Sequence, residues 1–194
     1  MKNIPLVLAV SLCASGLLAQ ETPEPPFRKI KLENPDFAIP ADNGVIGWSA
    51  YNRDWPGKLE IKDDEKEGKY LVITPLPSPT QKDKSGQIIQ VLVNSSPHFT
   101  AAVGDKVKIE FEFHLADAKT SGGPTLNGPS LAHWLPSFKA MRPKTGEWTK
   151  YSCVYAIKEL RDKVKGGKYS LGFCVSNSPV EIRKVAVSLQ KQGN

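Results

Sequence analysis

The clearest pattern along the chain is a strict alternation of apolar and polar side chains in residues 105–115. Every second residue there is apolar, namely Val107, Ile109, Phe111 and Phe113. The residues between them are charged or polar, namely Lys106, Lys108, Glu110, Glu112 and His114. A period of two places successive side chains on opposite faces of a strand, so the pattern predicts a half-buried antiparallel β-strand. We expect its four apolar side chains to lie in the core.

Five further segments are rich in the β-branched and aromatic residues that favour strands. They are residues 69–75, 86–94, 147–157, 168–176 and 180–189. Residues 157–167 have apolar residues at helical spacing and predict one or two turns that end at glycines. Two segments rich in Pro, Gly and Ser, 75–86 and 120–130, predict long loops. The sequence therefore predicts an all-β protein, a two-sheet antiparallel β-sandwich of the jelly-roll type with at most one short helix.

The first residues of the chain predict its destination. Lys2 is followed by an apolar run that ends near Ala19 and is too short to span a bilayer, which is typical of a secretory signal peptide. We therefore expect an exported protein, periplasmic or secreted, with no membrane span. Further segments follow this signal peptide of residues 1–19: a proline-rich lead-in (20–27), a single β-sandwich domain (28–190) and a tail (191–194).

Charge and histidine spacing narrow the range of partners. Without residues 1–19 the chain has 25 basic and 20 acidic residues, and both kinds are mixed along its length. Because no long basic block is present, nucleic acid is not expected as a partner. The three histidines lack the spacing of a transition-metal site, so no such site is expected.

Two cysteines follow the signal peptide, Cys153 and Cys174. An exported pair can form a disulfide. Strand alternation places Cys153 on the same face as Tyr151, but it places Cys174 on the face opposite Phe173 and its apolar neighbours. A disulfide needs side chains that converge, so two free thiols are the favoured prediction and a bridge is the alternative.

Several short motifs occur in an order that is found in one family. In chain order they are NPDF (34–37), GW (47–48), GKYLVIT (68–74), QIIQVLV (87–93), AVGDKVKIEFEF (102–113), TGEWTKYSCVYAI (145–157), YSLGFCVS (169–176) and IRKVAVSL (182–189). In this order the chain resembles the galactose-binding-like jelly rolls, and among them the bacterial carbohydrate-binding modules that bind xylans and glucans. The resemblance covers almost the whole exported chain, although each motif is short.

The resemblance implies a non-catalytic protein that binds a polysaccharide or a cell-surface glycan, in the cleft of one sheet or at the loops on its end. Family members often carry acids that help to hold a structural calcium ion. Ala38 and Arg183 stand near those positions here. We therefore expect no cofactor, with a structural calcium ion as the less favoured alternative.

The tryptophans are the first candidates for a sugar site. Trp48 in the GW motif and Trp148 at the start of a strand are predicted to lie in the core. Trp55 lies in a loop beside Arg53 and Asp54, where a flat apolar face and charged groups suit a sugar ring and its hydroxyls. For Trp55 the alternative is packing over the end of the sandwich.

Trp134 follows the glycine-rich segment 120–130, on a possible strand whose other face carries His133 and Leu135. A site role and a core role are equally open for it. The predicted ligand-binding residues are Tyr51, Arg53, Asp54, Trp55, Gln90, Glu112, His114 and Trp134.

Two alternatives come from other functional classes. One is a structural or protein-interaction β-sandwich that binds an extracellular protein and has no sugar site. The other is a glycoside hydrolase, because Glu110 and Glu112 are about 6.6–6.8 Å apart along one strand, a spacing compatible with a catalytic acid pair. Ion pairing of these carboxylates with Lys106 and Lys108 is the simpler explanation, so the protein is not expected to be an enzyme.

Overall fold

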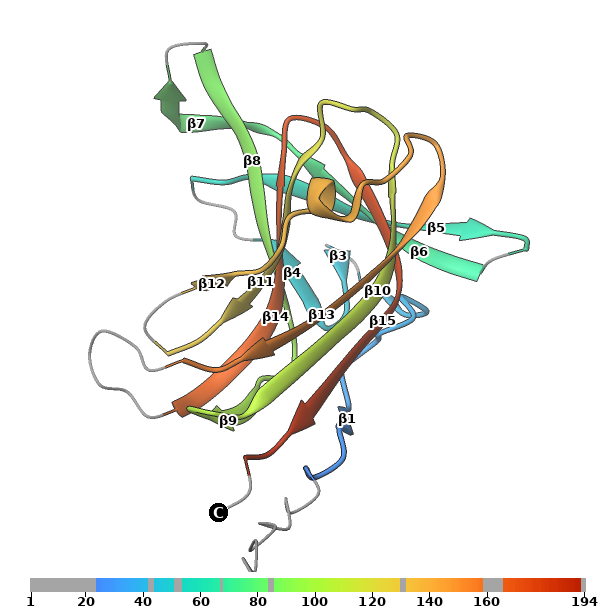
Figure 1. The fold of residues 1–194 in the computed structure, drawn as a ribbon. Coiled ribbons are helices and arrows are strands. Elements are labelled where there is room, and N and C mark those ends of the chain that lie inside the picture. The colour runs from blue at the N-terminus through green and yellow to red at the C-terminus, as the bar shows by residue number, and fades with distance from the viewer. Residues whose placement is uncertain are drawn as a thin grey trace, which may run out of the picture.

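The computed structural model describes residues 24–41, 44–50, 54–66, 68–83, 86–129, 132–158 and 166–192. These residues form two antiparallel β-sheets that pack face to face, as Figure 1 shows. The predicted all-β sandwich is confirmed. Each of the predicted strands is present, within one or two residues of its expected ends.

The first sheet has the strand order β13-β10-β15-β6-β5, and β1 pairs with β15 beside this path. Its strands are β1 (Arg28–Ile30), β5 (Gly57–Asp64), β6 (Gly68–Pro75), β10 (Lys106–Leu115), β13 (Trp148–Ala156) and β15 (Val180–Gln190). Strand β10 lies between two strands that are distant from it in sequence. Its residue Glu112 is therefore opposite Lys150 of β13 on one side and Arg183 of β15 on the other.

The second sheet has the strand order β12-β11-β14-β8-β4-β3-β2. Strand β7 pairs with β8 and strand β9 pairs with β14 beside this path. The strands are β2 (Pro40–Ala41), β3 (Gly44–Val45), β4 (Trp48–Ala50), β7 (Pro77–Asp83), β8 (Gly86–Ser95), β9 (Phe99–Ala102), β11 (Ser121–Asn127), β12 (Ala132–Trp134) and β14 (Gly166–Ser176). The β7–β8 hairpin extends beyond the body of the sandwich in Figure 1.

The core lies between the sheets and is rich in aromatic rings. Phe111 of β10 stacks on Tyr151 with ring centroids 4.5 Å apart, and it meets Phe173 of the second sheet edge-on at 5.2 Å. Such ring pairs add about 0.5–1.5 kcal/mol beyond the burial of their surface. The predicted core of β10 is confirmed, because Phe111 and its three apolar strand-mates are all buried. Trp48 is also buried, as predicted, and stacks on Phe173.

Two segments predicted as loops contain strands, so those predictions are wrong. Residues 75–86 hold β7, and residues 120–130 hold β11, which lies between β12 and β14. The glycines of β11 allow close packing rather than a turn. A Cβ on Gly123 would lie 2.8 Å from the Cα of Ser137, and a Cβ on Gly122 would collide with the Cys174 carbonyl oxygen. Glycine-rich composition therefore marks a close backbone approach here, not a loop.

The predicted turns in residues 157–167 fall mostly on residues 159–165, which lie outside the described residues. Within the described residues, the helical segment is η1 (Phe138–Met141), a single 3-10 turn that buries Phe138 against Phe111 and Phe113. The sequence did not predict this turn. No helix in the described part of the chain is long and apolar enough to cross a membrane.

The two cysteines are free thiols, in agreement with the favoured prediction. Cys153 lies in β13 of the first sheet and packs against the core. Cys174 lies in β14 of the second sheet and is buried, and this burial raises the pKa of its thiol to about 11. Both thiols are therefore protonated and unreactive at neutral pH.

Candidate functional site

The outer surface of the second sheet forms a continuous patch without charge. Its strands alternate, so that Val93, Leu126 and Phe173 face the core and their neighbours face outward. We call the outward residues the neutral face: Ser49, Gln90, Leu92, Asn94, Thr125, Asn127, Ala132, Trp134, Ser170, Gly172 and Cys174. No Asp, Glu, Lys, Arg or His belongs to this set of described residues. Along β14, Lys168 is the next charged residue beyond Ser170, and it is exposed.

One row of the neutral face crosses five strands. Backbone register aligns Trp134 with Thr125, Thr125 with Gly172, Gly172 with Asn94, and Asn94 with Ser49. Adjacent strands lie about 4.8 Å apart, so the row is about 19 Å long. Thr125 and Gly172 in the middle of the row are buried, so a ligand lying across the strands would contact Trp134 at one end and the Asn94 amide and the Ser49 hydroxyl further along.

Gly172 forms the floor of this row. A Cβ at this position would lie 2.5 Å from the Thr125 hydroxyl and 2.9 Å from the Asn94 side-chain oxygen, so a larger residue would displace these side chains. The Asn127 amide donates a hydrogen bond to the Asn94 carbonyl oxygen beside this floor. Within the described residues, no other hydrogen bond uses the Asn94 and Asn127 side chains. Each amide therefore keeps donor or acceptor capacity that a ligand can use.

Trp134 borders a shallow pocket on the neutral face. The pocket has a volume of about 220 Å³ and is lined by Leu92, Asn94, Thr125, Asn127, Ala132 and Trp134. Trp134 is 61% exposed, an unusual degree of exposure for the largest apolar side chain. Of the two roles left open by the sequence, a core role is excluded for Trp134. The adjacent His133 is buried and faces the other way.

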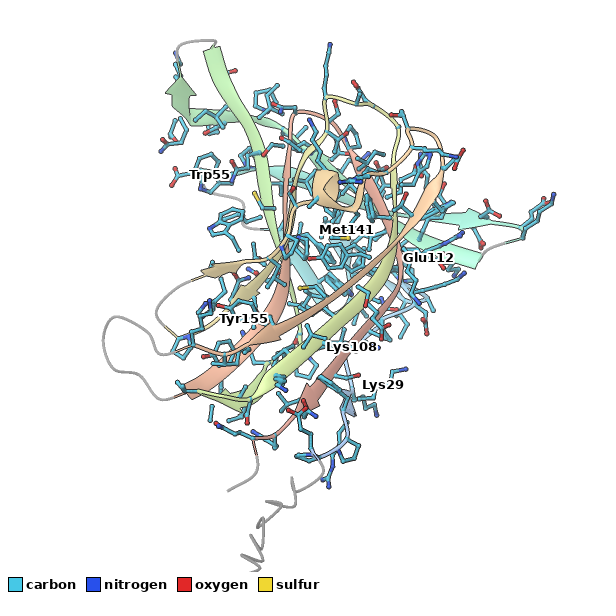
Figure 2. All side chains as sticks on the ribbon, in the orientation of Figure 1. Lys29, Trp55, Lys108, Glu112, Met141 and Tyr155 are labelled. Atoms are coloured by element: carbon cyan, nitrogen blue, oxygen red, sulfur yellow. The ribbon has the colours of Figure 1, made fainter. Side chains whose placement is uncertain are left out.

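The loop before β5 carries the other predicted aromatic residues. Tyr51 and Arg53 lie outside the described residues. Trp55 is half-buried, and Figure 2 shows it beside the β7–β8 hairpin. The carboxylate of Asp54 accepts a hydrogen bond of 2.8 Å from the Thr80 hydroxyl of β7. Asp54 thus ties the loop to the hairpin, and among the described residues no hydrogen bond or ion pair joins it to the neutral face.

The remaining predicted ligand-binding residues are divided between the two sheets. Gln90 lies on β8 and belongs to the neutral face, as does Trp134. Glu112 and His114 lie on β10, which belongs to the first sheet, so they face outward on the opposite side of the sandwich. Figure 2 shows Glu112 on that side, away from Trp55. The structure therefore does not bring the predicted residues together in one site.

We call the outward surface around Glu112 and His114 the charged face, and its carboxylates contact basic side chains. Its residues are Lys108, Glu110, Glu112, His114, Trp148, Lys150, Glu181, Arg183 and Lys184. Nε of Arg183 lies 2.7 Å and Nζ of Lys184 3.2 Å from Glu112 Oε2. His114 Nδ1 lies 2.8 Å from the Glu181 carboxylate. A non-glycine residue at positive φ, Lys184 (54°), accompanies a register shift in the β10–β15 pairing.

Trp148 belongs to the charged face, so its predicted core position is wrong. It pairs with His114 in the strand register, and the Arg183 guanidinium carbon lies 3.9 Å from its ring centroid. Tyr70 meets the same ring edge-on. Strand alternation explains this position, because Tyr151 faces the core and Trp148 is an odd number of residues away.

The two carboxylates that could form a catalytic acid pair are engaged in ion pairs. Partial burial acts to raise the pKa of Glu112, but the hydrogen bonds and charges of Arg183 and Lys184 outweigh it and lower the pKa. Glu110 is paired with Lys108 at 2.9 Å. A catalytic acid of this class requires a raised pKa, so the ion pairs favour a structural role for both carboxylates. Among the described residues, no group of three or more His, Cys, Asp or Glu could hold a metal ion.

Comparison with known proteins defines the fold. No protein-family model matches the sequence, and no curated protein matches it. The structure is similar to that of the Stig cyclase Fisc from Fischerella sp. TAU, solved in complex with a substituted indole, with a TM-score of 0.56 and 10% identity. The similarity covers 87% of this chain and 100% of the cyclase chain.

The structure is also similar to part of a chain that comprises the CBM22-1 and GH10 modules of endo-1,4-β-D-xylanase 10B from Clostridium thermocellum, complexed with xylohexaose. The TM-score is 0.54 at 12% identity, over 86% of this chain and 29% of that chain. This chain therefore spans less than a third of the xylanase chain. The jelly-roll fold of the carbohydrate-binding modules is thus present here, as the sequence resemblance implied. At these identities the likeness shows the fold alone.

Proposed function

We propose that the protein is an exported, non-catalytic polysaccharide-binding protein and that the neutral face is its binding site. The observation that carries this proposal is an uncharged polar sheet surface bordered by Trp134, which is 61% exposed. A sugar ring offers an apolar face of C–H groups and a rim of hydroxyls. An aromatic ring and neutral amides are complementary to these two features.

The lack of charge favours a neutral polysaccharide over an acidic one. A carboxylated or sulfated glycan would be desolvated on this surface without a cationic partner, which is costly. Hydroxyl groups can exchange water for the Asn94 and Asn127 amides at little net cost. The length of the row, about 19 Å across five strands, suits an oligosaccharide segment rather than a single sugar.

Binding is favoured over catalysis, although one structural neighbour is a cyclase. Among the described residues of the neutral face, the titratable group is the Cys174 thiol, which is buried and has a pKa of about 11. It cannot act as a general acid or base near neutral pH. The structural likeness to a chain solved with xylohexaose supports a sugar ligand, and the predicted signal peptide supports export.

The alternative is a protein-interaction domain that uses the same surface, because exposed tryptophan and leucine also suit a protein interface. Retention of residues 20–194 on immobilised xylan, β-glucan and cellulose, and on pectin as an acidic control, separates the two. We expect retention on at least one neutral polysaccharide and none on pectin. If no glycan retains the protein, the sugar proposal is wrong and the interaction domain remains.

A steric variant locates the site. Gly172→Val places methyl groups where Thr125, Asn127 and Asn94 converge, so it should reduce retention at least tenfold. Ser152→Val is the matched control, because Ser152 is exposed on β13 of the opposite sheet. Circular dichroism of both variants shows whether the sandwich is preserved. Unchanged retention by a folded Gly172→Val variant would place the ligand elsewhere.

A further inference from the structure

Two adjacent residues of strand β12 face opposite ways, one on the neutral face and one in the core. Trp134 faces outward and is 61% exposed, whereas His133 faces inward and is 8% exposed. The strand has three residues, lies at the edge of the second sheet and pairs with β11. So short an edge strand gains little from its backbone hydrogen bonds, and its position depends on buried side chains such as His133 and Leu135.

His133 connects β12 to the opposite sheet. Its Nδ1 lies 3.0 Å from the hydroxyl oxygen of Tyr155, which belongs to β13 of the first sheet. Figure 2 shows Tyr155 beside β11 and β12. The rings of Tyr155 and Tyr169 lie 5.4 Å and 6.1 Å from the imidazole. The Nε2 atom of His133 and the hydroxyl of Tyr169 are buried and have no hydrogen-bond partner among the described residues.

We propose that His133 is a positioning residue of the binding site. When neutral, it anchors β12 and so holds Trp134 against the neutral face; when protonated, it releases both. This inference rests on the proposed glycan-binding function and adds a pH dependence to it.

The surroundings of His133 favour its neutral form. A protonated imidazole has two N–H donors, and Nε2 has no described acceptor. The titratable groups that face His133 are the hydroxyls of Tyr155 from β13 and Tyr169 from β14, and no carboxylate of the described residues contacts it. Burial accordingly lowers the pKa of His133. A released, hydrated histidine has an ordinary pKa of about 6.5, so the anchored state loses stability as the pH falls below that value.

The side chains of the neutral face do not titrate between about pH 8 and pH 5.5. Its described side chains are hydroxyls, amides, apolar groups and a buried thiol. The chain has three histidines, and the other two lie elsewhere. His98 is exposed before β9, and His114 is on the charged face beside Glu181. A pH dependence between about 8 and 5.5 therefore identifies a histidine, and substitution shows which one.

The test measures the affinity of the exported chain for its best neutral polysaccharide between pH 8 and pH 5.5. We expect constant affinity from pH 8 to pH 7 and a loss of about threefold or more by pH 5.5. His133→Asn keeps an amide near the position of Nδ1 but cannot titrate, so its affinity should not vary with pH. The matched controls His98→Asn and His114→Asn should retain the dependence of the unmodified protein.

Amide hydrogen exchange of residues 132–135 gives a second measurement that needs no ligand. After correction for the intrinsic rate, exchange should accelerate at pH 5.5 in the unmodified protein but not in His133→Asn. Tyr155→Phe, which removes the hydrogen-bond partner, should accelerate exchange already at pH 8. If His133→Asn does not fold, Tyr155→Phe and the two controls still test the anchor.

Three results would overturn the proposal: exchange of β12 that does not depend on pH, a pH dependence that disappears with His98 or His114, or constant affinity in the unmodified protein. A failure of the proposed function looks different. In that case no glycan is retained at any pH, while the exchange measurement still reports whether His133 anchors β12.

Discussion

The two outer faces of this sandwich are built by the same strand alternation but carry opposite kinds of surface. On the charged face, the Glu110 and Glu112 carboxylates pair with Lys108 and Arg183 of the same sheet. On the neutral face, the described polar groups are hydroxyls and amides. The main contact between them is the hydrogen bond from Asn127 to Asn94. Carboxylates of the charged face are thus engaged within the sheet, whereas the amides of the neutral face keep hydrogen-bonding capacity for a ligand.

The aromatic residues show the same difference. Trp148 on the charged face is covered by the Arg183 guanidinium at 3.9 Å, so its ring is already engaged. Trp134 on the neutral face is 61% exposed and has no ring or cation partner among the described residues. The comparison teaches that residue type alone does not identify a binding aromatic. An aromatic ring is available to a ligand only where no other side chain already covers it.

The largest expected effect comes from removing one carboxylate of the charged face. Glu112→Gln leaves the buried Arg183 without its carboxylate, so we expect the free energy of unfolding to fall by about 2 kcal/mol. Urea denaturation at pH 7 measures this change, and glycan retention below the transition should stay the same. Glu60→Gln is the control, because its ion pair with Lys58 is exposed and such pairs contribute little. Equal losses for both variants would contradict the comparison.

Trp134→Ala tests the neutral face itself. Loss of an exposed stacking ring should weaken polysaccharide binding more than tenfold, which corresponds to about 1.4 kcal/mol or more. The melting temperature should change by no more than about 2 °C, because the side chain is mostly outside the core. Trp148→Ala should do the reverse, lowering the melting temperature and leaving binding intact. The two faces would not be functionally distinct if both variants lost binding equally.

The acid sensitivity of folding should come from groups outside the neutral face. The carboxylate of Asp105 accepts hydrogen bonds from the backbone N–H groups of Ala102 and Gln192 and pairs with Lys191 at 2.8 Å. Its burial acts to raise its pKa, but these contacts outweigh burial and lower the pKa. The resulting stability is present above the ordinary aspartate pKa of about 3.9 and is lost as the pH falls through the lowered value.

Asp105→Asn therefore should cost about 1 kcal/mol at pH 7, and the difference from the unmodified protein should shrink below about pH 4. Thermal unfolding between pH 7 and pH 3 checks this. A difference that stays constant over that range would mean that the carboxylate charge of Asp105 does not contribute.

The smallest expected effect is that of salt on binding. A surface without charge should bind a neutral glycan with less than about a twofold change in affinity between roughly 0.05 M and 1 M sodium chloride. Affinity electrophoresis or calorimetry at these concentrations measures it. A steep fall with salt would show that cationic residues, and hence the charged face or a loop, take part in binding.

Part of this structure was predictable from local patterns. The alternation in residues 105–115 predicted which side chains of β10 are buried, because a strand sends successive side chains to opposite faces whatever its neighbours are. The same rule separated the two cysteines, whereas the burial of Trp48 was predicted from the GW motif. Composition was misleading for residues 120–130: their glycines and proline predicted a loop, but in β11 they allow close packing between β12 and β14.

The sequence by itself determined the inward and outward sides of most strands and the all-β class, since both follow from interactions within a few residues. Only the tertiary structure decided which sheet each strand joins. That choice placed Gln90 and Trp134 on one face and Glu112 and His114 on the other, although all four had been predicted to bind a ligand. It also turned Trp148 outward beneath Arg183. Strand pairing depends on contacts between residues far apart in the chain, and a local pattern of polar and apolar positions contains no information about them.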